Sequence, residues 1–181
     1  MFFTTLLIIS FYIISIYNSL IKKRVMVDEG WSGIDVQLKR RHNLIPNLSA
    51  VVKKYAAHES EVFTKLAESR ERCMGAGDNV KNLSQAESGI SMGLKSILAI
   101  AESYPELKSD KNFLEFQNEL SDIEDHIQMA RRYYNGTTRD LNISIDSFPQ
   151  NLIANKFNFT KREFFEVEES QKALPKVQEL L

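Results

Sequence analysis

The basic run Lys39-Arg40-Arg41-His42 is the part of the sequence that comes nearest to a functional cluster. Its guanidinium and ammonium groups could contact a lipid headgroup or a partner protein. The long helix expected around this run has too few helical neighbours to cover its whole length, so we predict an interaction surface here. The residues assigned to that surface are Trp31, Asp35, Lys39, Arg40, Arg41 and His42.

Arg41 differs from its neighbours because it falls on the apolar stripe of the expected helix, where an unpaired charge would be costly. For this residue we therefore favour an ion pair inside a helical bundle over a ligand site. The expected partners lie on a helix predicted over about residues 110–146, namely Glu115, Glu119, Asp122, Glu124 and Asp125.

An alternative function is an enzyme or ligand-binding protein with a polar site between helices around His42, His58 and Asp122. Such groups would have to lie within hydrogen-bond reach of one substrate. The sequence has no G-x-S-x-G motif, P-loop or dinucleotide fingerprint, and its three histidines are scattered. We therefore predict a non-enzymatic protein with no catalytic residue, no metal site and no cofactor. The formal net charge of −1 gives no indication of nucleic-acid binding.

The first 21 residues carry no charged side chain and are mostly apolar. As a helix they span roughly 30 Å, about one hydrocarbon core. We predict a transmembrane anchor over residues 1–21 rather than a cleaved signal peptide, because the basic residues follow the apolar run instead of preceding it. Tyr17, Lys22, Lys23 and Arg24 are expected at the membrane interface.

The same basic residues predict the orientation of the anchor. Six Lys and Arg side chains lie between Lys22 and Arg41. By the positive-inside rule, the part of the chain after the anchor stays in the cytoplasm and the amino terminus lies outside. We therefore expect a single-pass protein of the cell membrane with a cytoplasmic helical domain.

The rest of the chain, residues 22–181, shows the apolar spacing of helices and no sustained alternation typical of strands. Its stripes predict helices over about residues 25–72, 83–104, 110–146 and 150–156, followed by a C-terminal tail. The predicted fold class is all-α, with an N-terminal transmembrane helix followed by an elongated antiparallel helical bundle with long heptad-patterned helices.

Two further expectations concern the effect of Pro46 on the first helix and the contacts of the tail with the bundle. Pro46 interrupts the hydrogen-bond ladder of the first one; since the apolar phase is the same on both sides, we favour a bend, the alternative being a break with Asn43 capping a second helix. Arg139, Asp140 and Asn142 are expected to tie the third helix to the tail. We also expect the apolar side chains of the tail to dock on the bundle, because their exposure would favour aggregation. They are Leu152, Ile153, Phe157, Phe159, Phe164, Phe165 and Val167.

Several of these segments together resemble the LemA family of bacterial membrane proteins. The resemblance lies in Val27-Asp28-Glu29-Gly30-Trp31, in the run from Ile34 to Leu48 (IDVQLKRRHNLIPNL), and in Tyr104-Pro105 and Phe164-Phe165-Glu166. It implies a single-pass protein with a mostly antiparallel helical domain and no established enzymatic activity. Some members of the family are associated with bacterial organelle membranes, which implies a role in membrane organisation.

These observations predict a membrane-anchored, non-enzymatic helical protein that presents an interaction or membrane-organising surface. Its expected partners are the lipid bilayer and either another protein or further copies of itself, associated through helices.

Overall fold

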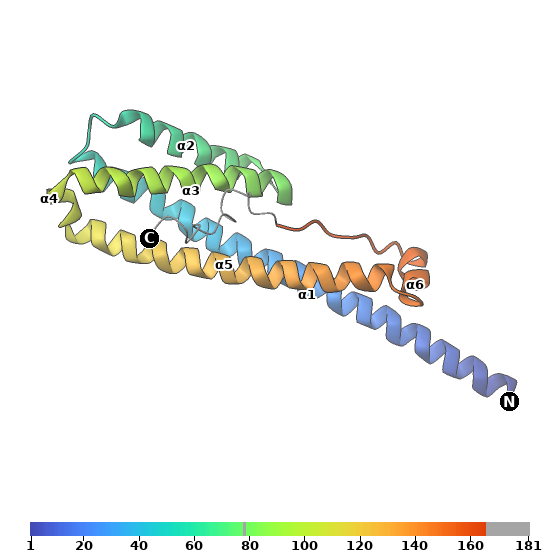
Figure 1. Cartoon of the computed structure of the whole chain (residues 1–181). Coiled ribbons are helices and arrows are strands. Elements are labelled where there is room, and N and C mark those ends of the chain that lie inside the picture. Colours follow the sequence, from blue (N-terminus) through green and yellow to red (C-terminus); the bar gives the residue numbers. More distant parts are fainter. Residues whose placement is uncertain (78, 166–181) are drawn as a thin grey trace, which may run out of the picture. The chain divides into compact units, whose positions relative to one another are not determined.

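The computed structural model of the protein describes residues 1–77 and 79–165, in which the chain forms helices and their connections without a strand. The helices are α1 (Phe2–Lys53), α2 (Ser60–Gly75), α3 (Val80–Ser103), α4 (Pro105–Lys108), α5 (Lys111–Asp146) and α6 (Gln150–Lys156) (Figure 1). The predicted all-α class with a long apolar helix at its amino-terminal end is confirmed. Two compact units can be distinguished. We call residues 1–38 and 124–164 the anchor unit, and residues 39–123 together with Phe165 the hairpin unit.

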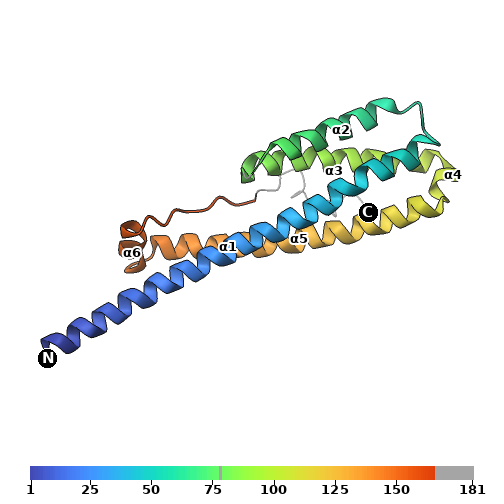
Figure 2. The same cartoon turned by 180° about the vertical axis from the view of Figure 1, so that it is seen from behind.

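In the anchor unit, the first part of α1 packs antiparallel to the second part of α5 (Figure 2). Lys23 donates a hydrogen bond to the Ser144 hydroxyl, and about one heptad further along α1 the Trp31 ring packs on the Tyr134 ring with centroids 5.6 Å apart. Gly30 permits this close approach, because a Cβ atom there would lie 3.0 Å from the Cα atom of Tyr134.

The segment after α6 is held on the same unit by the hydrogen bonds of Asn142. Its side-chain amide donates to the Arg162 carbonyl and its oxygen accepts from the Arg162 backbone N–H, both over 2.9 Å. The Tyr134 hydroxyl also donates to the Glu163 carbonyl over 2.8 Å, and Arg162 forms an ion pair of 2.9 Å with Asp28. The predicted tie to the tail is therefore confirmed for Asn142, whereas Arg139 forms an ion pair with the neighbouring Asp140.

The hairpin unit contains the second part of α1, then α2, α3, α4 and the first part of α5. Its helices α1, α2 and α3 are each antiparallel to the one before. Helices α2 and α3 approach closely through two glycines of α3, since a Cβ at Gly89 would lie 2.9 Å from Ser69 Oγ and one at Gly93 would lie 2.9 Å from Leu66 Cδ1. Asn79 caps α3 by accepting a 2.9 Å hydrogen bond from the backbone N–H of Asn82. The core of this unit consists mainly of the aliphatic stripes of the three helices.

The structure differs from the predicted helix over about residues 25–72, because the chain leaves α1 after Lys53 and starts α2 at Ser60. Pro46 lies inside α1, so the alternative of a break near Asn43 is wrong. The residues of the reversal have ordinary helix propensity, and Ala56 within it is buried. Tertiary packing of α2 back on α1 therefore decides where the helix ends.

The predicted docking of the tail's apolar side chains is only partly correct. Phe159 and Phe165 are buried, whereas Leu152, Phe157 and Phe164 are exposed and Ile153 is half-buried. Val167 lies outside the described residues. Residues that the sequence predicts to be covered by protein are thus open on the surface of the anchor unit.

Candidate functional site

Three charged or polar side chains lie together in the apolar core of the hairpin unit. Arg41 and His42 come from α1 and Glu87 comes from α3, and we call these three residues the polar cluster. Arg41 and Glu87 are each only 1% exposed, and His42 is 9% exposed. Each charge occupies a position on an otherwise apolar helical stripe, which explains why the helices carry it into the core.

Glu87 is the centre of the polar cluster, because both of its carboxylate oxygens are bound. Arg41 Nη2 donates to Glu87 Oε2 as a buried ion pair, and His42 Nε2 lies 2.7 Å from Glu87 Oε1. Arg41 Nη1 also donates to the Ser91 hydroxyl over 3.3 Å. The predicted ion pair of Arg41 is confirmed, but the prediction that its partner lies on the helix over residues 110–146 is wrong, since Glu87 belongs to α3.

The electrostatic balance of the polar cluster favours an ionised Glu87. Burial by itself would raise the pKa of this carboxyl group, but the hydrogen bond from His42 and the charge of Arg41 outweigh it and lower the pKa below its ordinary value of 4.5. A carboxylate that stays charged and accepts from two donors is a structural counter-ion. It is poorly suited to act as a general base near neutral pH, because such a base needs a raised pKa.

A second polar contact joins a side chain of α2 to a backbone carbonyl of α1. Pro46 has no N–H, so the carbonyl of His42, four residues earlier, lacks its usual helical donor. Arg70 Nε donates to this carbonyl over 3.1 Å. Arg70 therefore supplies the hydrogen bond that Pro46 removes, and it fixes α2 against α1 beside the polar cluster.

Cys73 of α2 borders the polar cluster and is buried. Burial, together with the negative charge of Glu87, raises the pKa of its thiol to about 12. A thiol with such a pKa is almost entirely protonated at neutral pH and is a weak nucleophile. The environment of Cys73 is therefore that of a core residue.

His42, Cys73 and Glu87 are also the described residues whose donor atoms could jointly approach one metal ion, since these atoms lie within 4.8 Å of one another. A metal would have to replace the hydrogen bond between His42 and Glu87, compete with Arg41 for the carboxylate, and deprotonate the thiol. The arrangement as it stands satisfies these groups with one another, and it is that of an ion-pair network.

An open groove of about 350 Å³ runs between α1 and α2 on the hairpin unit. Its floor is mostly apolar, and the Lys53 ammonium lies over the Phe63 ring, 5.2 Å from the centroid. The groove is lined by Ile45, Pro46, Ser49, Ala50, Lys53, Phe63, Ala67, Arg70 and Glu71. Its lining resembles a contact surface for apolar side chains more than a reaction site.

The structure separates the residues assigned to the predicted interaction surface. Lys39 and Arg40 are exposed, and Trp31 and Asp35 are half-buried. Arg41 and His42 are buried in the polar cluster, so their assignment to a surface is wrong. The reason is that successive residues of a helix point in different directions, and the apolar stripe carries Arg41 inward.

The alternative site around His42, His58 and Asp122 does not form a common pocket. His42 is bonded to Glu87 in the core, whereas His58 lies exposed in the connection between α1 and α2 and Asp122 is exposed on α5. The partner of the buried His42 among the described residues is therefore Glu87, which the sequence prediction did not include.

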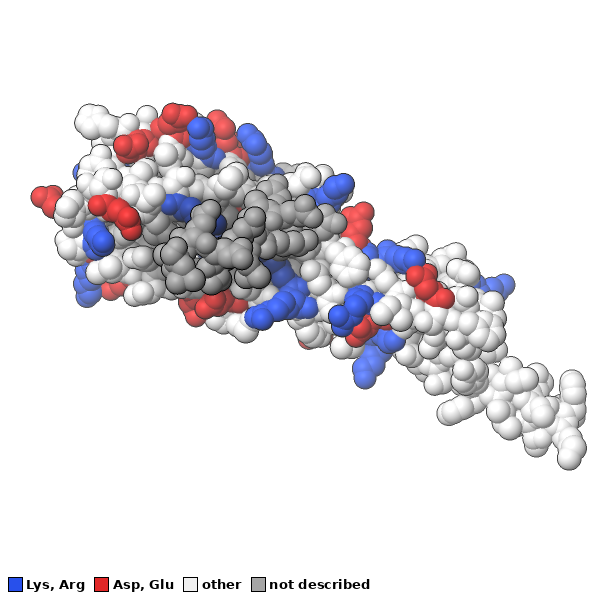
Figure 3. Space-filling model, in the orientation of Figure 1, with Lys and Arg blue, Asp and Glu red and all other residues white. Residues whose placement is uncertain are grey.

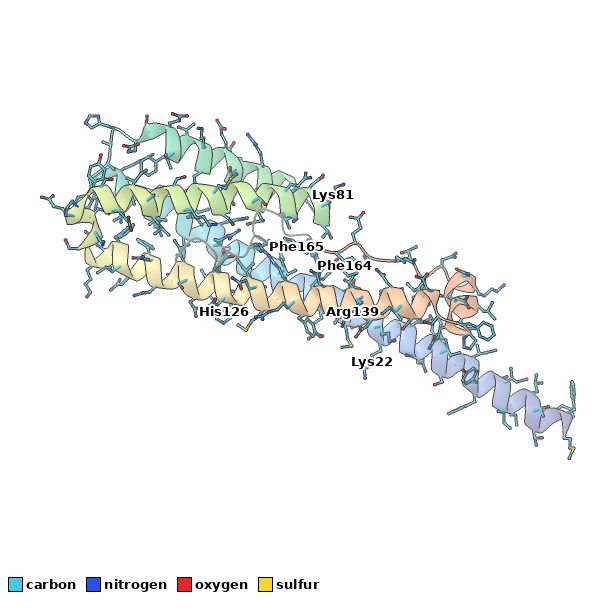
Figure 4. The ribbon with its side chains drawn as sticks, in the orientation of Figure 1. Lys22, Lys81, His126, Arg139, Phe164 and Phe165 are labelled. Carbon is cyan, nitrogen blue, oxygen red and sulfur yellow. The ribbon has the colours of Figure 1, made fainter. Side chains whose placement is uncertain are left out.

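The residues predicted at the membrane interface all lie on α1 in the anchor unit. Lys22 and Arg24 are exposed, and Lys22 projects outward from the helix (Figure 4). Tyr17 is half-buried and packs on the Phe157 ring, with centroids 4.8 Å apart. Lys23 bonds to Ser144 of α5. Before Tyr17, α1 is a bare apolar rod without acidic or basic side chains (Figure 3).

Glu87, Ser91 and Arg70 are the site residues that the sequence prediction missed. A signal for Glu87 exists, because the stripe Leu83, Ile90, Leu94 has a gap that position 87 fills, just as Arg41 fills a position on the stripe of α1. Two opposite charges on two apolar stripes indicate a buried pair. Arg70 has no comparable signal, because only the three-dimensional position of the His42 carbonyl makes it necessary.

Comparison with known proteins adds to this geometry. The LemA family profile matches residues 30–178, which is most of the chain. The chain belongs to the LemA family. The match includes all of the polar cluster, the whole of α3 and the part of α1 from Gly30 onward.

Individual relatives are distant in sequence. The chain is 25% identical to the magnetosome protein MamQ of Magnetospirillum gryphiswaldense, a match that covers 91% of this chain and 67% of that protein. It is also 25% identical to the magnetosome protein MamQ 2 of Paramagnetospirillum magneticum, over 83% of this chain and 64% of that protein. Protein LemA of Metamycoplasma hominis shows 25% identity over 94% of this chain and 78% of its own length. The chain thus spans about two thirds of the length of the magnetosome relatives.

Membership of the LemA family agrees with the architecture of the chain. Among the helices of the described residues, α1 is the one that is long and apolar enough to cross a membrane. The chain is therefore a membrane-associated helical protein of the LemA family.

Proposed function

We propose that this LemA-family protein is a membrane-anchored, non-enzymatic protein that presents an interaction or membrane-organising surface beside the bilayer. The observation that carries the proposal is the continuity of α1, which runs as one helix from its bare apolar start to Lys53. The same helix that enters the bilayer contributes core residues to both units. A continuous helix, instead of a linker, therefore connects the apolar span to residues of both units.

The chemistry of the polar cluster supports a non-enzymatic role. Its acid, its base and its guanidinium group are buried and bonded to one another, and the nearby Cys73 thiol is protonated at neutral pH. These groups stabilise the arrangement of α1 and α3. The match to relatives that are named as magnetosome proteins is consistent with an organising role.

We assign the interaction surface to the exposed side of α1 around Lys39 and Arg40 in the hairpin unit. Trp31 and Asp35, which are half-buried on α1 in the anchor unit, are proposed as contact residues of that unit. Two exposed cationic side chains suit a partner with acidic groups, and a half-buried aromatic ring suits apolar groups. The partner is either a second protein or another copy of this chain. The basic residues that follow the apolar span support a cytoplasmic side for this surface by the positive-inside rule.

Site-specific photocrosslinking in native membranes tests this assignment. A photoreactive benzoylphenylalanine replaces Lys39 in the full chain, and a matched variant carries it at Lys95, an exposed lysine of α3. We expect a discrete adduct from position 39 and none above background from position 95. An adduct with twice the mass of the chain identifies self-association, and equal yields at both positions contradict the assigned surface.

A further inference from the structure

The anchor unit exposes a group of apolar side chains that are too large and too close together for a surface in water. Phe148, directly before α6, is 79% exposed, Leu152 within α6 is 58% exposed, and Phe157 at its end is 52% exposed. These three residues lie within ten positions of each other, and we call residues 148–157 the α6 segment. Contiguous exposed apolar patches commonly mark a surface that is covered by another molecule or by lipid.

The α6 segment is fixed to α1 at the end of the apolar rod. Tyr17 packs on Phe157 and also on the Phe159 ring, whose centroid is 5.9 Å away. Arg24, two turns further along α1, places its guanidinium group 5.4 Å from the centroid of the same Phe159 ring. The α6 segment therefore lies at the level of Tyr17 to Arg24 along α1, and Figure 1 shows it beside the helix where the bare rod ends.

The length of the bare apolar rod indicates how deep in the bilayer the α6 segment would lie. Residues 1–15 are exposed without interruption, whereas Ile16 and Leu20 are buried under neighbouring parts of the anchor unit. From Phe2 to Ser15 the helix rises only about 20 Å. A hydrocarbon core is about 30 Å thick, so the rod alone is roughly 10 Å too short to cross it. The missing length corresponds to the uncharged residues up to Ile21.

We propose that the α6 segment is a second membrane-inserted element, which enters the bilayer beside α1 and places Phe148, Leu152 and Phe157 among the lipid chains near the headgroups. Whatever packs on Ile16 and Leu20 must share their depth, and three exposed side chains of the α6 segment are large and apolar. Cationic side chains lie next to this apolar region, since Lys22 on α1 and Lys156 on α6 are exposed, and lipid phosphates would lie beside them. Figure 4 shows Lys22 projecting from α1.

This inference rests on the membrane anchor of the proposed function. It also explains why the prediction of a docked tail fails for these residues. The sequence shows that Leu152 and Phe157 must avoid water, but a bilayer meets that requirement as well as a protein core.

Fluorescence quenching by lipids with brominated acyl chains tests the proposal. Trp31 is the single tryptophan, so a Trp31→Phe background removes the native signal. In that background the full chain is reconstituted into phosphatidylcholine–phosphatidylglycerol vesicles with one new tryptophan at a time. Leu152→Trp and Phe148→Trp report on the α6 segment, and Phe11→Trp, which replaces a 76% exposed residue of the apolar rod, reports on the anchor.

Tyr133→Trp is the matched control in the same unit. Tyr133 is an exposed aromatic residue of α5 that contacts Glu29, about 18 Å along α1 from Tyr17. We expect quenching at positions 148 and 152 to reach at least half of that at position 11, with little at position 133. Far-ultraviolet circular dichroism verifies equal helicity of the variants.

The control positions separate the two ways in which the proposal can fail. Quenching at position 11 together with positions 148 and 152 at the level of position 133 would overturn the insertion of the α6 segment and leave the anchor intact. In that case a protein partner would be the remaining cover for the patch. Absence of quenching at position 11 as well would overturn both the anchor and the inserted segment.

Discussion

Glu87 is the residue on which the core of the hairpin unit depends most, because it accepts from both Arg41 and His42. Glu87→Gln removes the counter-charge and leaves Arg41 as a buried cation without it. Breaking a buried ion pair from one side typically costs about 3–5 kcal/mol. We therefore expect a loss of this size in the free energy of unfolding, measured by chemical denaturation of the full chain in detergent micelles.

A matched substitution distinguishes the buried pair from a general effect of charge. Glu68→Gln removes a carboxylate that is 57% exposed on α2. Since surface ion pairs contribute little, the expected change is within about 0.5 kcal/mol. Equal effects of the two substitutions would contradict the structural role of Glu87.

The lowered pKa of Glu87 also predicts how stability depends on pH. A carboxyl group whose pKa is lower in the folded state contributes stability that is fully present above its unfolded value, here 4.5, and lost as the pH falls through the folded value. We expect the unfolding free energy of the wild-type chain to fall more steeply below pH 4.5 than that of Glu87→Gln. Denaturation curves between pH 6 and pH 3 measure the difference, and parallel curves for the two proteins would contradict it.

Cys73 offers a chemical test of the same core. With a thiol pKa of about 12 and a buried side chain, Cys73 has almost no thiolate at pH 7.5. We expect its alkylation by iodoacetamide in the native chain to be at least about 100-fold slower than that of a cysteine introduced at the exposed Met92. Mass spectrometry after timed quenching measures both rates in a Met92→Cys protein, and similar rates would show that the core around Cys73 opens.

At the scale of the helices, Pro46 and Arg70 form a compensating pair. Arg70→Met leaves the His42 carbonyl without its donor, which should cost about 1–2 kcal/mol. In a Pro46→Ala background the new N–H of residue 46 bonds to that carbonyl, so the same substitution should cost at least about 0.5 kcal/mol less. The four unfolding free energies of this double-mutant cycle measure the coupling. Arg72→Met, at a side chain 73% exposed on α2, is the control and should show no coupling.

The helices also show what apolar spacing can and cannot predict. Spacing predicts the stripes correctly, and with them the burial of Arg41, because the same periodicity decides which side chains face a neighbour. It does not predict the reversal between Lys53 and Ser60, since Tyr55 and Val62 continue the stripe across it. The reversal is stabilised by contacts distant in sequence, such as the 2.9 Å hydrogen bond from the Tyr55 hydroxyl to Asp110. Such contacts leave no local pattern.

For the molecule as a whole, the sequence predicts where the apolar start of the chain ends and the charged part begins. It does not predict as well whether a given apolar residue is buried in protein or left exposed on the surface. Phe159 and Leu152 are both apolar and near the end of the chain, yet one is buried and the other exposed. Composition treats them alike because transfer from water into a protein core or into lipid is favourable in the same way. The position of α6 beside Tyr17 is what separates the two environments.

The orientation of the whole chain is the remaining property that its charges predict. By the positive-inside rule, we expect the part of the chain that follows the apolar start of α1 to lie on the side of the membrane to which Lys22, Lys23 and Arg24 belong. We expect Met92→Cys to react with a membrane-impermeant maleimide only after cells are opened, and Phe2→Cys, at the other end of the apolar rod, to react in intact cells. The native Cys73 does not interfere, because its thiol is buried and protonated. Labelling of Met92→Cys in intact cells would place the helical units outside the cytoplasm, and the lipid and protein partners would then have to be sought on that side.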